Sequence, residues 1–486
     1  MEPEIEEPAP SADSDADLLA GIPDSEPVLA DAAGGGGDAD LLSGIPDSDY
    51  AADEAASGML PAESDASVRL DQGLRWHLDT SVTGYDRRTP LPDPGNDPST
   101  ATGRARIVTE GGFALGPATT LRLNAALSGR IDSGDGFDFD DDARFDLREA
   151  FILHQTGNFT FQIGRINIRN GVAQGFNPTD FFRALNVDQS PNLDPGEARL
   201  NRLGVVAAQV GYLWDSGAAS LTYTPEITGG SDWWHDRDVW GLRLNATNPR
   251  DRFLLSLTQE FGDGFSPEAF LFFDDGEVTG GLAGSVSIGD RWLAYAEMTH
   301  GQGRSILDSS LRQARRIGRL APPIAAAYGD GDDKTGITQA ALGMSYTSST
   351  NLVATAEYHY NGAGFDDDDW DNYFDLARAV EGNRPASAQL ASMFLYGAFR
   401  QEPLSKHSLF FRVAQNDLAD GKMTVSGLST VSLADGSGSA QVEAAYELSD
   451  DMILTGRLGG TFGGRETDFG SRSNQAFATV KMDFHF

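Results

Sequence analysis

Single arginines recur in several stretches of this sequence in which polar and apolar residues alternate, so that each arginine falls on the polar face. A guanidinium group stays charged at every physiological pH and matches the oxygen geometry of carboxylate and phosphate. Arginines gathered on one surface would therefore attract anions. Alternation assigns Arg75, Arg122, Arg130, Arg243, Arg412 and Arg457 to such a surface.

Two stretches are rich in carboxylates: Arg130–Asp142 reads RIDSGDGFDFDDD, and Phe365–Asp371 reads FDDDDWD. Clustered carboxylates with glycine can hold Ca²⁺, which takes about six to eight oxygen ligands. Asp138, Asp140 and Asp142 are the candidate ligands, although their spacing does not match an EF-hand loop. The alternative is that both stretches are solvated acidic loops. We expect no other cofactor.

Signatures of catalysis are missing from the sequence. It contains no Cys, no GxSxG and no HExxH, and its seven His are scattered. We therefore predict that the protein is not an enzyme. The formal net charge of −37 also excludes a nucleic-acid partner, because the phosphate backbone requires positive protein charge.

The elements that position these arginines have the period of a β-strand, whose side chains alternate between two faces. In Leu74–Tyr85, apolar Leu74, Trp76, Leu78 and Val82 alternate with polar side chains. The same pattern occurs at Leu121–Arg130, Trp240–Asn245, Leu352–Tyr360 and Met452–Phe462. An apolar outer face with a polar inner face is the inverse of a soluble barrel and typical of a transmembrane one.

The last strand, Gln475–Phe486, shows this pattern most clearly and ends on an aromatic residue. Phe477 is the one apolar side chain on its polar face. Such a terminal strand is typical of bacterial outer-membrane barrels, where it faces lipid, and we expect the barrel assembly machinery to recognise it. The sequence has no run of about 18 apolar residues that could form a transmembrane helix. Its mean hydropathy of −0.32 agrees with strands in which only alternate residues are apolar.

Turn lengths predict the number of strands. Both termini of a bacterial outer-membrane barrel lie in the periplasm, so the strand number is even and every second connection is short. Eight short turns give eighteen strands, and we predict an all-β, antiparallel, up-and-down barrel. This count assigns Phe265–Val278 to a loop and Ala386–Phe399 to a helix in a long outer loop. If either segment is a strand, twenty strands is the alternative. The eight turns are Gly116–Ala118, Thr156–Asn158, Asp215–Gly217, Asn248–Asp251, Gly289–Arg291, Ser348–Thr350, Leu418–Gly421 and Ser449–Asp451.

A further loop is basic rather than acidic. We predict a helix that ends before Pro322, and it would either fold into the lumen or pair with the acidic loops. Its arginines are Arg304, Arg312, Arg315, Arg316 and Arg319.

Residues 1–68 form a separate acidic tail with 18 Asp and Glu and no Lys or Arg. Its low apolar content predicts disorder. It contains two near-identical copies of DADLLxGIPDS, at Asp15–Ser25 and Asp38–Ser48. The repeat is either a duplicated spacer or a motif that docks a periplasmic protein, with avidity from two copies. The apolar positions of the motif are Leu18, Leu19, Ile22, Leu41, Leu42 and Ile45.

Residues 69–486 form the predicted barrel domain. We expect it in the bacterial outer membrane, in contact with outer-membrane lipid and with the tail in the periplasm. Export requires a signal peptide, which does not precede EPEIEEPAP, so we expect the chain to be a processed form.

Two stretches, Phe145–Arg183 and Val431–Gly463, resemble outer-membrane porins of the alginate-export type and related porin families. The resemblance implies an eighteen-stranded barrel that passes a hydrophilic or anionic solute, in alginate exporters a polyuronate, through an arginine-rich lumen. It adds Arg148, Arg165 and Arg169 to the predicted pore lining. Glu149 and Arg165 lie in phase with apolar neighbours, which a β-bulge would explain.

The predicted function is an outer-membrane channel for a hydrophilic, anionic solute or polymer. The alternative is a station of a trans-envelope export machine that recruits a periplasmic or inner-membrane partner through the repeated motif. A secreted soluble β-sandwich is the third possibility. The barrel region holds 55 acids against 36 bases, so anion passage requires most of the acids to lie outside the lumen.

Overall fold

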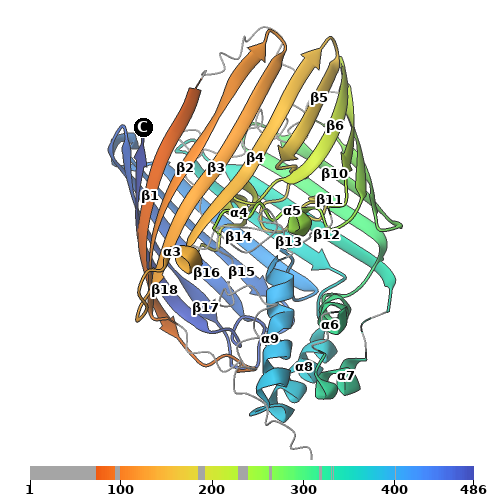
Figure 1. The fold of residues 1–486 in the computed structure, drawn as a ribbon, viewed down its shortest axis with the longest axis vertical. Coiled ribbons are helices and arrows are strands. Elements are labelled where there is room, and N and C mark those ends of the chain that lie inside the picture. The colour runs from red at the N-terminus through yellow and green to blue at the C-terminus, as the bar shows by residue number, and fades with distance from the viewer. Residues whose placement is uncertain are drawn as a thin grey trace, which may run out of the picture.

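The computed structural model describes residues 73–93, 99–183, 192–227, 239–261, 265–316, 320–329, 331, 333–399 and 401–486. Within these residues, eighteen antiparallel strands form one closed sheet in sequence order (Figure 1). This confirms the predicted eighteen-stranded antiparallel barrel. The strands are β1 (Gly73–Arg87), β2 (Ala101–Gly116), β3 (Thr119–Asp132), β4 (Ala143–Thr156), β5 (Phe159–Ile166), β6 (Val205–Trp214), β7 (Gly217–Thr224), β8 (Arg252–Gln259), β9 (Glu268–Asp274), β10 (Glu277–Ile288), β11 (Trp292–Gly303), β12 (Thr335–Thr347), β13 (Leu352–Asn361), β14 (His407–Asp417), β15 (Met423–Ser432), β16 (Gly438–Ser449), β17 (Met452–Phe462) and β18 (Asn474–His485).

The barrel closes where β18 pairs with β1. Leu78 lies opposite Phe484 and Val82 opposite Val480. The backbone N–H of Phe486 donates to the Trp76 carbonyl at 2.8 Å. The C-terminal strand therefore leaves no open edge, as a barrel requires.

The two faces of the wall differ as alternation predicts. Val82 and Leu458 expose 64% and 65% of their surface on the outside. On the inner face of β1, Asp79 and Thr83 are buried, and so is Phe477 of β18. A surface of exposed apolar side chains around a polar interior is what a barrel in lipid requires.

Most short connections lie at the end of the barrel that holds the C-terminus, and the long connections lie at the other end, where the two-residue β9–β10 turn is an exception (Figure 1). Seven of the eight predicted short turns join strands as expected. The eighth, Asn248–Asp251, was placed wrongly: it ends the long connection before β8.

Two element assignments near this turn are also wrong, and they cancel in the strand count. Trp240–Asn245 is not a strand, and α5 (Leu244–Thr247) begins within it. Phe265–Val278 is not a loop, because it contains β9 between β8 and β10. Both errors arise because alternation in an isolated stretch does not show whether a neighbouring strand is there to pair with it.

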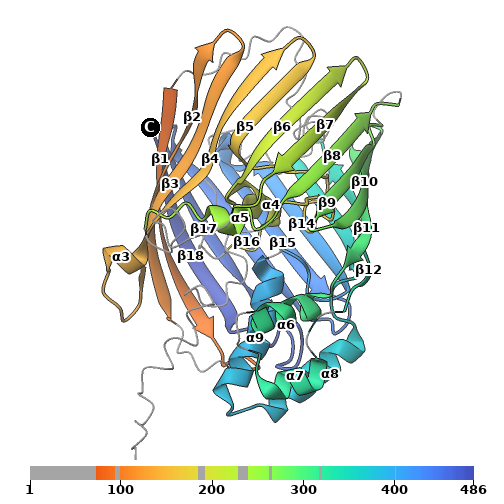
Figure 2. The ribbon, with the colours of Figure 1, turned by 45° about the vertical axis from the view of Figure 1, so that its right-hand side comes forward.

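Four helices cover part of the long-loop end and form a cap (Figures 1 and 2): α6 (Ile306–Arg316), α7 (Pro322–Tyr328), α8 (Asp367–Ala379) and α9 (Arg384–Phe399). Leu311, Ile324, Trp370 and Leu390 belong to their shared apolar core. The predicted helix at Ala386–Phe399 is confirmed as α9. The basic stretch forms α6 in this cap rather than in the lumen. Among the described residues, no helix is both long and apolar enough to cross a membrane.

The remaining helical segments are single turns: α3 (Phe139–Asp142), α4 (Pro195–Leu200), α5 and α10 (Leu418–Gly421). α10 is a turn between β14 and β15 in which Ala419 and Asp420 adopt left-handed backbone angles. The predicted domain boundary at residue 69, the acidic tail and its repeats lie outside the described residues.

One stretch of the wall lacks a complete strand ladder. β5 is short and pairs with β4 only from Ala150 to Thr156. Beyond it, residues 201–204 and 239–248 lie against β4 instead: Phe145 N–H donates to Val239 O at 2.7 Å, and Gly204 N–H to Arg148 O at 2.9 Å. We call this part of the barrel wall the wall breach. It lies between residues 143–149 of β4 and the start of β6, where β5 is too short to pair and residues 201–204 and 239–248 take its place.

Candidate pore constriction

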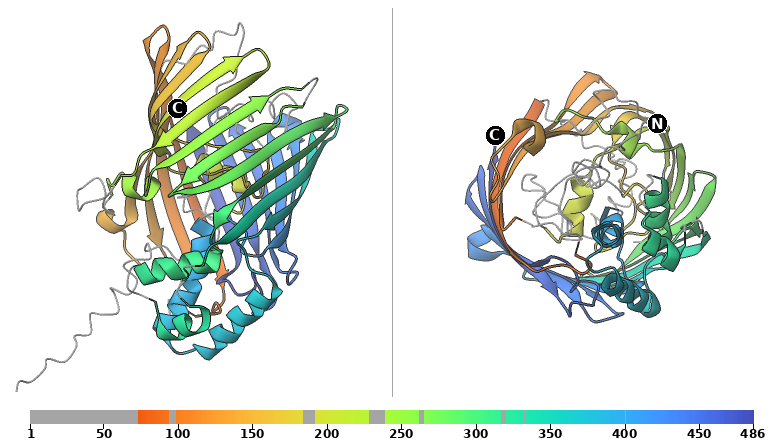
Figure 3. Two further views of the ribbon diagram at one scale, coloured as in Figure 1. Left: turned by 90° about the vertical axis from the view of Figure 1, so that its right-hand side faces the viewer. Right: turned by 60° about the horizontal axis from the view of Figure 1, so that its bottom comes forward.

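The chain between β5 and β6 leaves the wall after Ile166 and folds into the lumen before it rejoins the wall at Val205. Its described residues, 167–183 and 192–204, are called the lumen insert. Figure 3 shows α4, which belongs to it, inside the ring of strands. The insert narrows the pore, so its anchors decide the geometry of the lumen.

The first anchor is Glu297 on the inner face of β11. Its carboxylate accepts the backbone N–H groups of Val172, Ala173 (2.5 Å) and Thr179 (3.2 Å) and the Thr179 hydroxyl (2.7 Å). Glu297 is almost completely buried. A buried carboxylate that accepts several charge-assisted hydrogen bonds holds the backbone around it in one conformation.

The second anchor is Glu357 of β13, which binds the next residues of the insert. It accepts the N–H groups of Gln174 at 2.7 Å and Gly175 at 2.8 Å. Tyr295 donates to it at 2.5 Å, and His359 Nε2 lies 2.7 Å away. A Cβ atom at Gly175 would lie 2.5 Å from the Phe410 ring, so only glycine fits this close approach.

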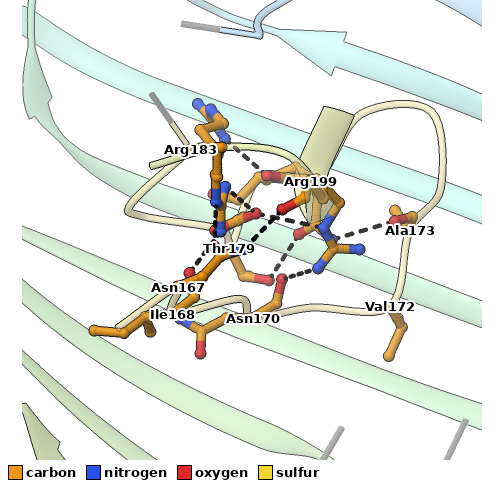
Figure 4. Close-up of polar contacts among 12 residues, drawn as sticks. Asn167, Ile168, Asn170, Val172, Ala173, Thr179, Arg183 and Arg199 are labelled. Atoms are coloured by element: carbon orange, nitrogen blue, oxygen red, sulfur yellow. Dashed lines mark hydrogen bonds and ion pairs between the residues drawn. The ribbon is translucent and has the colours of Figure 1, made fainter. Parts of the chain in front are cut away.

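A buried ion pair holds the insert together internally. Arg202 binds Asp180 through two nitrogens, at 2.8 and 2.9 Å, and donates to Asn167 Oδ1 at 2.8 Å. Arg199 lies 3.4 Å from Asp180. Figure 4 shows Asn167, Thr179 and Arg199 converging in this network. The bidentate geometry fixes both ends of the insert to each other.

The third anchor ties α4 to the opposite side of the wall. Asp194 lies 3.2 Å from Arg412 of β14, and Glu197 lies 3.9 Å from Arg457 of β17. Gln441 of β16 bonds to Asn192 at 2.6 Å and to the Leu193 N–H at 2.8 Å. The insert therefore bridges the lumen.

Glu197 has an unusual acidity for a glutamate. Burial raises the pKa of its carboxyl group to about 7, against the opposing attraction of Arg457, and the nearby Glu443 acts in the same direction as burial. The side chain still exposes 30% of its surface to the lumen, so a proton can reach it from water.

The wall of β1–β3 presents arginines on its inner face. Arg104 and Arg130 lie directly opposite each other in the β2–β3 register. Like charges in this position repel. Asp132, 3.0 Å from Arg130, offsets part of that repulsion. The same face carries Arg75, Arg106 and Arg122 and the carboxylates Asp79, Glu110 and Asp132, so its arginines outnumber its acids.

The predicted pore-lining arginines occupy three different environments. Arg75, Arg122 and Arg130 lie on the inward face of β1 and β3, as alternation predicts. Arg412 and Arg457 also point inward and bind the insert. Arg169 belongs to the insert itself.

Arg148, Arg165 and Arg243 differ from the prediction. Arg148 is buried and donates to Asn201 Oδ1 of the insert at 2.6 Å. Arg165 is buried in the wall breach, and Arg243 reaches it from the segment that fills the breach. These three side chains lie within protein rather than on an open lumen surface, because segments distant in sequence cover them.

The expected bulge is present beside Glu149. The β3–β4 register shifts between Asn124 and Ala125, which leaves Arg148 as the extra residue and turns Glu149 inward. Arg165 has a different explanation: it keeps the outward phase of Ile163 but lies at the breach, where other segments bury it.

The acidic loop near α3 uses its carboxylates on its own backbone. Asp138 accepts the Asp140 N–H at 3.0 Å, and Asp142 accepts the Asp138 N–H at 2.7 Å. Across the described ranges, no group of three or more His, Cys, Asp or Glu is arranged to hold a metal. We carry the calcium prediction no further.

Sequence reasoning missed Glu297 as a functional residue and treated Glu357 only as an inward polar side chain. The available signal was a glutamate on the inward face of β11, between Tyr295 and Thr299. Its partner, the backbone of residues 172–179, gave no signal because any sequence supplies N–H groups.

No protein-family model matches this sequence. A search of curated proteins found no match. Among solved structures, the chain is similar to Acinetobacter baumannii OccAB1 at 10% identity and a TM-score of 0.47, covering 87% of this chain and 99% of that one. It is also similar to the outer membrane protein opdK from Pseudomonas aeruginosa (8% identity, TM-score 0.46, 85% and 99% covered) and to a mutant of the Rh. blastica porin (13%, 0.38, 85% and 99%). The alginate-export resemblance stays a prediction from the sequence.

Proposed function

We propose that this chain is a bacterial outer-membrane channel that passes hydrophilic, anionic solutes. The apolar outer surface of a closed barrel suits a lipid environment. A polar lumen crossed by a well-anchored insert suits selective diffusion rather than a sealed interior. The polyuronate implied by the sequence resemblance is one member of this solute class.

The observation that carries the anionic preference is the arginine-bearing wall of β1–β3. Its arginines outnumber the carboxylates on the same face. The acidic residues of the insert, Asp180, Asp194 and Glu197, are engaged by Arg202, Arg412 and Arg457. Positive charge at close quarters lowers the energy of an anion in the pore.

Liposome swelling tests this proposal. Proteoliposomes that contain the full chain should admit sugar acids such as galacturonate faster than neutral sugars of the same size. Arg104→Gln combined with Arg130→Gln should remove that difference and leave neutral sugars unaffected. Equal rates for charged and neutral sugars in the unaltered protein would refute the anionic preference.

A second function, recruitment of a periplasmic partner, rests on the duplicated DADLLxGIPDS motif. β1 begins beside the short-turn end, since Gly73 pairs with Gly112 near the β2–β3 turn. In outer-membrane barrels that end faces the periplasm. Replacing Leu18, Leu19, Leu41 and Leu42 by serine in the full chain should abolish capture of a periplasmic protein and leave channel activity intact.

A further inference from the structure

Three arginines lie in the wall breach, and two of them bind one carboxylate. Arg144 Nε lies 3.2 Å from Asp146, and Arg243 Nη2 also binds Asp146. Arg165 donates to the backbone carbonyls of Gly204 and Leu242, each at 2.9 Å. Within the described part of the breach, three guanidinium groups are therefore accompanied by one carboxylate, Asp146.

The excess charge is buried. Arg165 exposes only 4% of its surface, and Asp146 only 3%. Arg165 Nη2 and Arg243 Nε are buried and have no hydrogen-bond acceptor among the residues that the structure describes. A buried, charged donor without an acceptor is costly, because the group has lost its hydration and no hydrogen bond replaces it. An anion in the breach would remove that cost.

Arg243 is held in place at a further cost. It adopts the left-handed backbone region with φ of 50°, which is uncommon for any residue other than glycine.

We propose that the wall breach is an oxyanion-binding site in which Arg144, Arg165 and Arg243 bind a phosphate or carboxylate group. Guanidinium forks match the geometry of both oxyanions. Arg144 lies on the inward face of β4 and leaves 29% of its side chain exposed, so it is the side of the site that a solute in the lumen can reach. On the outward side of the breach, the ring centroid of the exposed Trp240 lies 5.6 Å from that of Phe145. The breach therefore also borders the surrounding lipid, and lipid phosphate groups are the second possible source of the bound oxyanion. Occupancy of the site does not depend on passage through the pore.

Calorimetric titration of the detergent-purified full chain with inorganic phosphate tests the free-anion source. Arg243→Gln and Arg144→Gln should each weaken binding about tenfold or more, since one hydrogen bond to a charged group contributes about 1.5–3 kcal/mol. Arg250→Gln is the matched control, because Arg250 is exposed and pairs with Asp274 at 2.9 Å outside the site. Heat-modifiable gel mobility confirms that each variant is folded. If Arg243→Gln does not fold, the more exposed Arg144 decides the outcome.

Native mass spectrometry of protein extracted from membranes tests the lipid source. Bound phospholipid or lipopolysaccharide that is lost in both variants and kept in the control supports the site with a lipid phosphate, even if inorganic phosphate does not bind. The proposal is overturned if the unaltered protein binds neither probe, or if both variants bind as the unaltered protein does.

Discussion

Single carboxylates on the inner wall determine where the lumen insert lies. Glu297 and Glu357 each accept several donors from the insert, most of them backbone N–H groups. A backbone held in this way cannot shift without leaving several buried donors unpaired. The constriction is therefore set by two side chains of the wall and by the backbone of the insert.

Replacing Glu297 by glutamine should loosen the insert. The glutamine NH₂ group would face the N–H and hydroxyl donors of Thr179 and lose hydrogen bonds worth about 1.5–3 kcal/mol each. Single-channel records should show a larger and noisier conductance. Asp275→Asn is the control, because Asp275 lies in the exposed β9–β10 turn and pairs with Arg250 rather than with the insert. Equal conductance in Glu297→Gln and the unaltered protein would show that this anchor is dispensable.

The raised pKa of Glu197 predicts a pH-dependent selectivity. A carboxyl group with a pKa of about 7 is charged above that pH and neutral below it. As the pH falls through about 7, the lumen loses one negative charge, so anion preference should rise. The native state binds this proton more tightly than the unfolded chain does, so the contribution of Glu197 to stability falls as the pH rises from about 4.5 to about 7.

Reversal potentials measured on both sides of neutral pH check this prediction. Glu197→Gln should hold the low-pH selectivity at every pH. A pH dependence that survives in Glu197→Gln would assign the titration to another group.

At the residue scale, alternation alone placed Arg130, Arg412 and Arg457 correctly, because period two is a local property of a strand. The same reasoning placed Arg243 in the lumen lining, and the family resemblance placed Arg165 there although its strand phase is apolar. Both predictions failed because the surroundings of these side chains are made by segments distant along the chain. Residues about 40 positions away, 201–204, lie beside Arg165, and β4, about 100 positions away, lies beside Arg243.

Two features distinguish this barrel from a simple closed sheet. The first is the short strand β5, after which the wall breach begins and the chain enters the lumen as the insert. The second is the helical cap. The cap has its own apolar core and a hydrogen bond from Trp370 Nε1 to Ser405 at 3.1 Å. Ser405 in turn donates to Asp468 at 2.8 Å. The hydrogen bonds tie the cap to the barrel at its rim, but the apolar core belongs to the cap, so we expect the cap to be destabilised without unfolding of the barrel.

Trp370→Ala should loosen the cap and leave the barrel folded. A tryptophan removed from a packed core costs about 3–5 kcal/mol. Limited proteolysis should cut within α8 or α9, whereas heat-modifiable mobility should stay unchanged. Trp292→Ala, on the exposed face of β11, should show neither effect. Loss of the folded barrel in Trp370→Ala would show that cap and barrel fold as one unit.

The number of strands was predicted correctly, but partly through compensating errors. One stretch assigned as a strand, Trp240–Asn245, fills the breach instead, and β9 replaces a predicted loop. Parity required an even number, and this constraint corrected the total without correcting the positions. The sequences of the long connections told least about their own structure, because the path of such a connection depends on its contacts with the inner face of the barrel.

The whole molecule combines a lipid-compatible exterior, a polar lumen and an uneven charge distribution. Much of the net charge of −37 lies in residues 1–68, so the barrel is less acidic than the chain as a whole. Within the barrel, carboxylates such as Glu297 and Glu357 are engaged by the insert, while the β1–β3 wall keeps its arginines. Anion passage through an acidic protein is therefore physically consistent.

Single-channel conductance of the full chain in planar bilayers, with the reversal potential under a salt gradient, tests anion passage most directly. A steady conductance with anion preference is the expected result. A folded, heat-modifiable barrel that prefers cations, or that shows no conductance, would contradict the proposed channel.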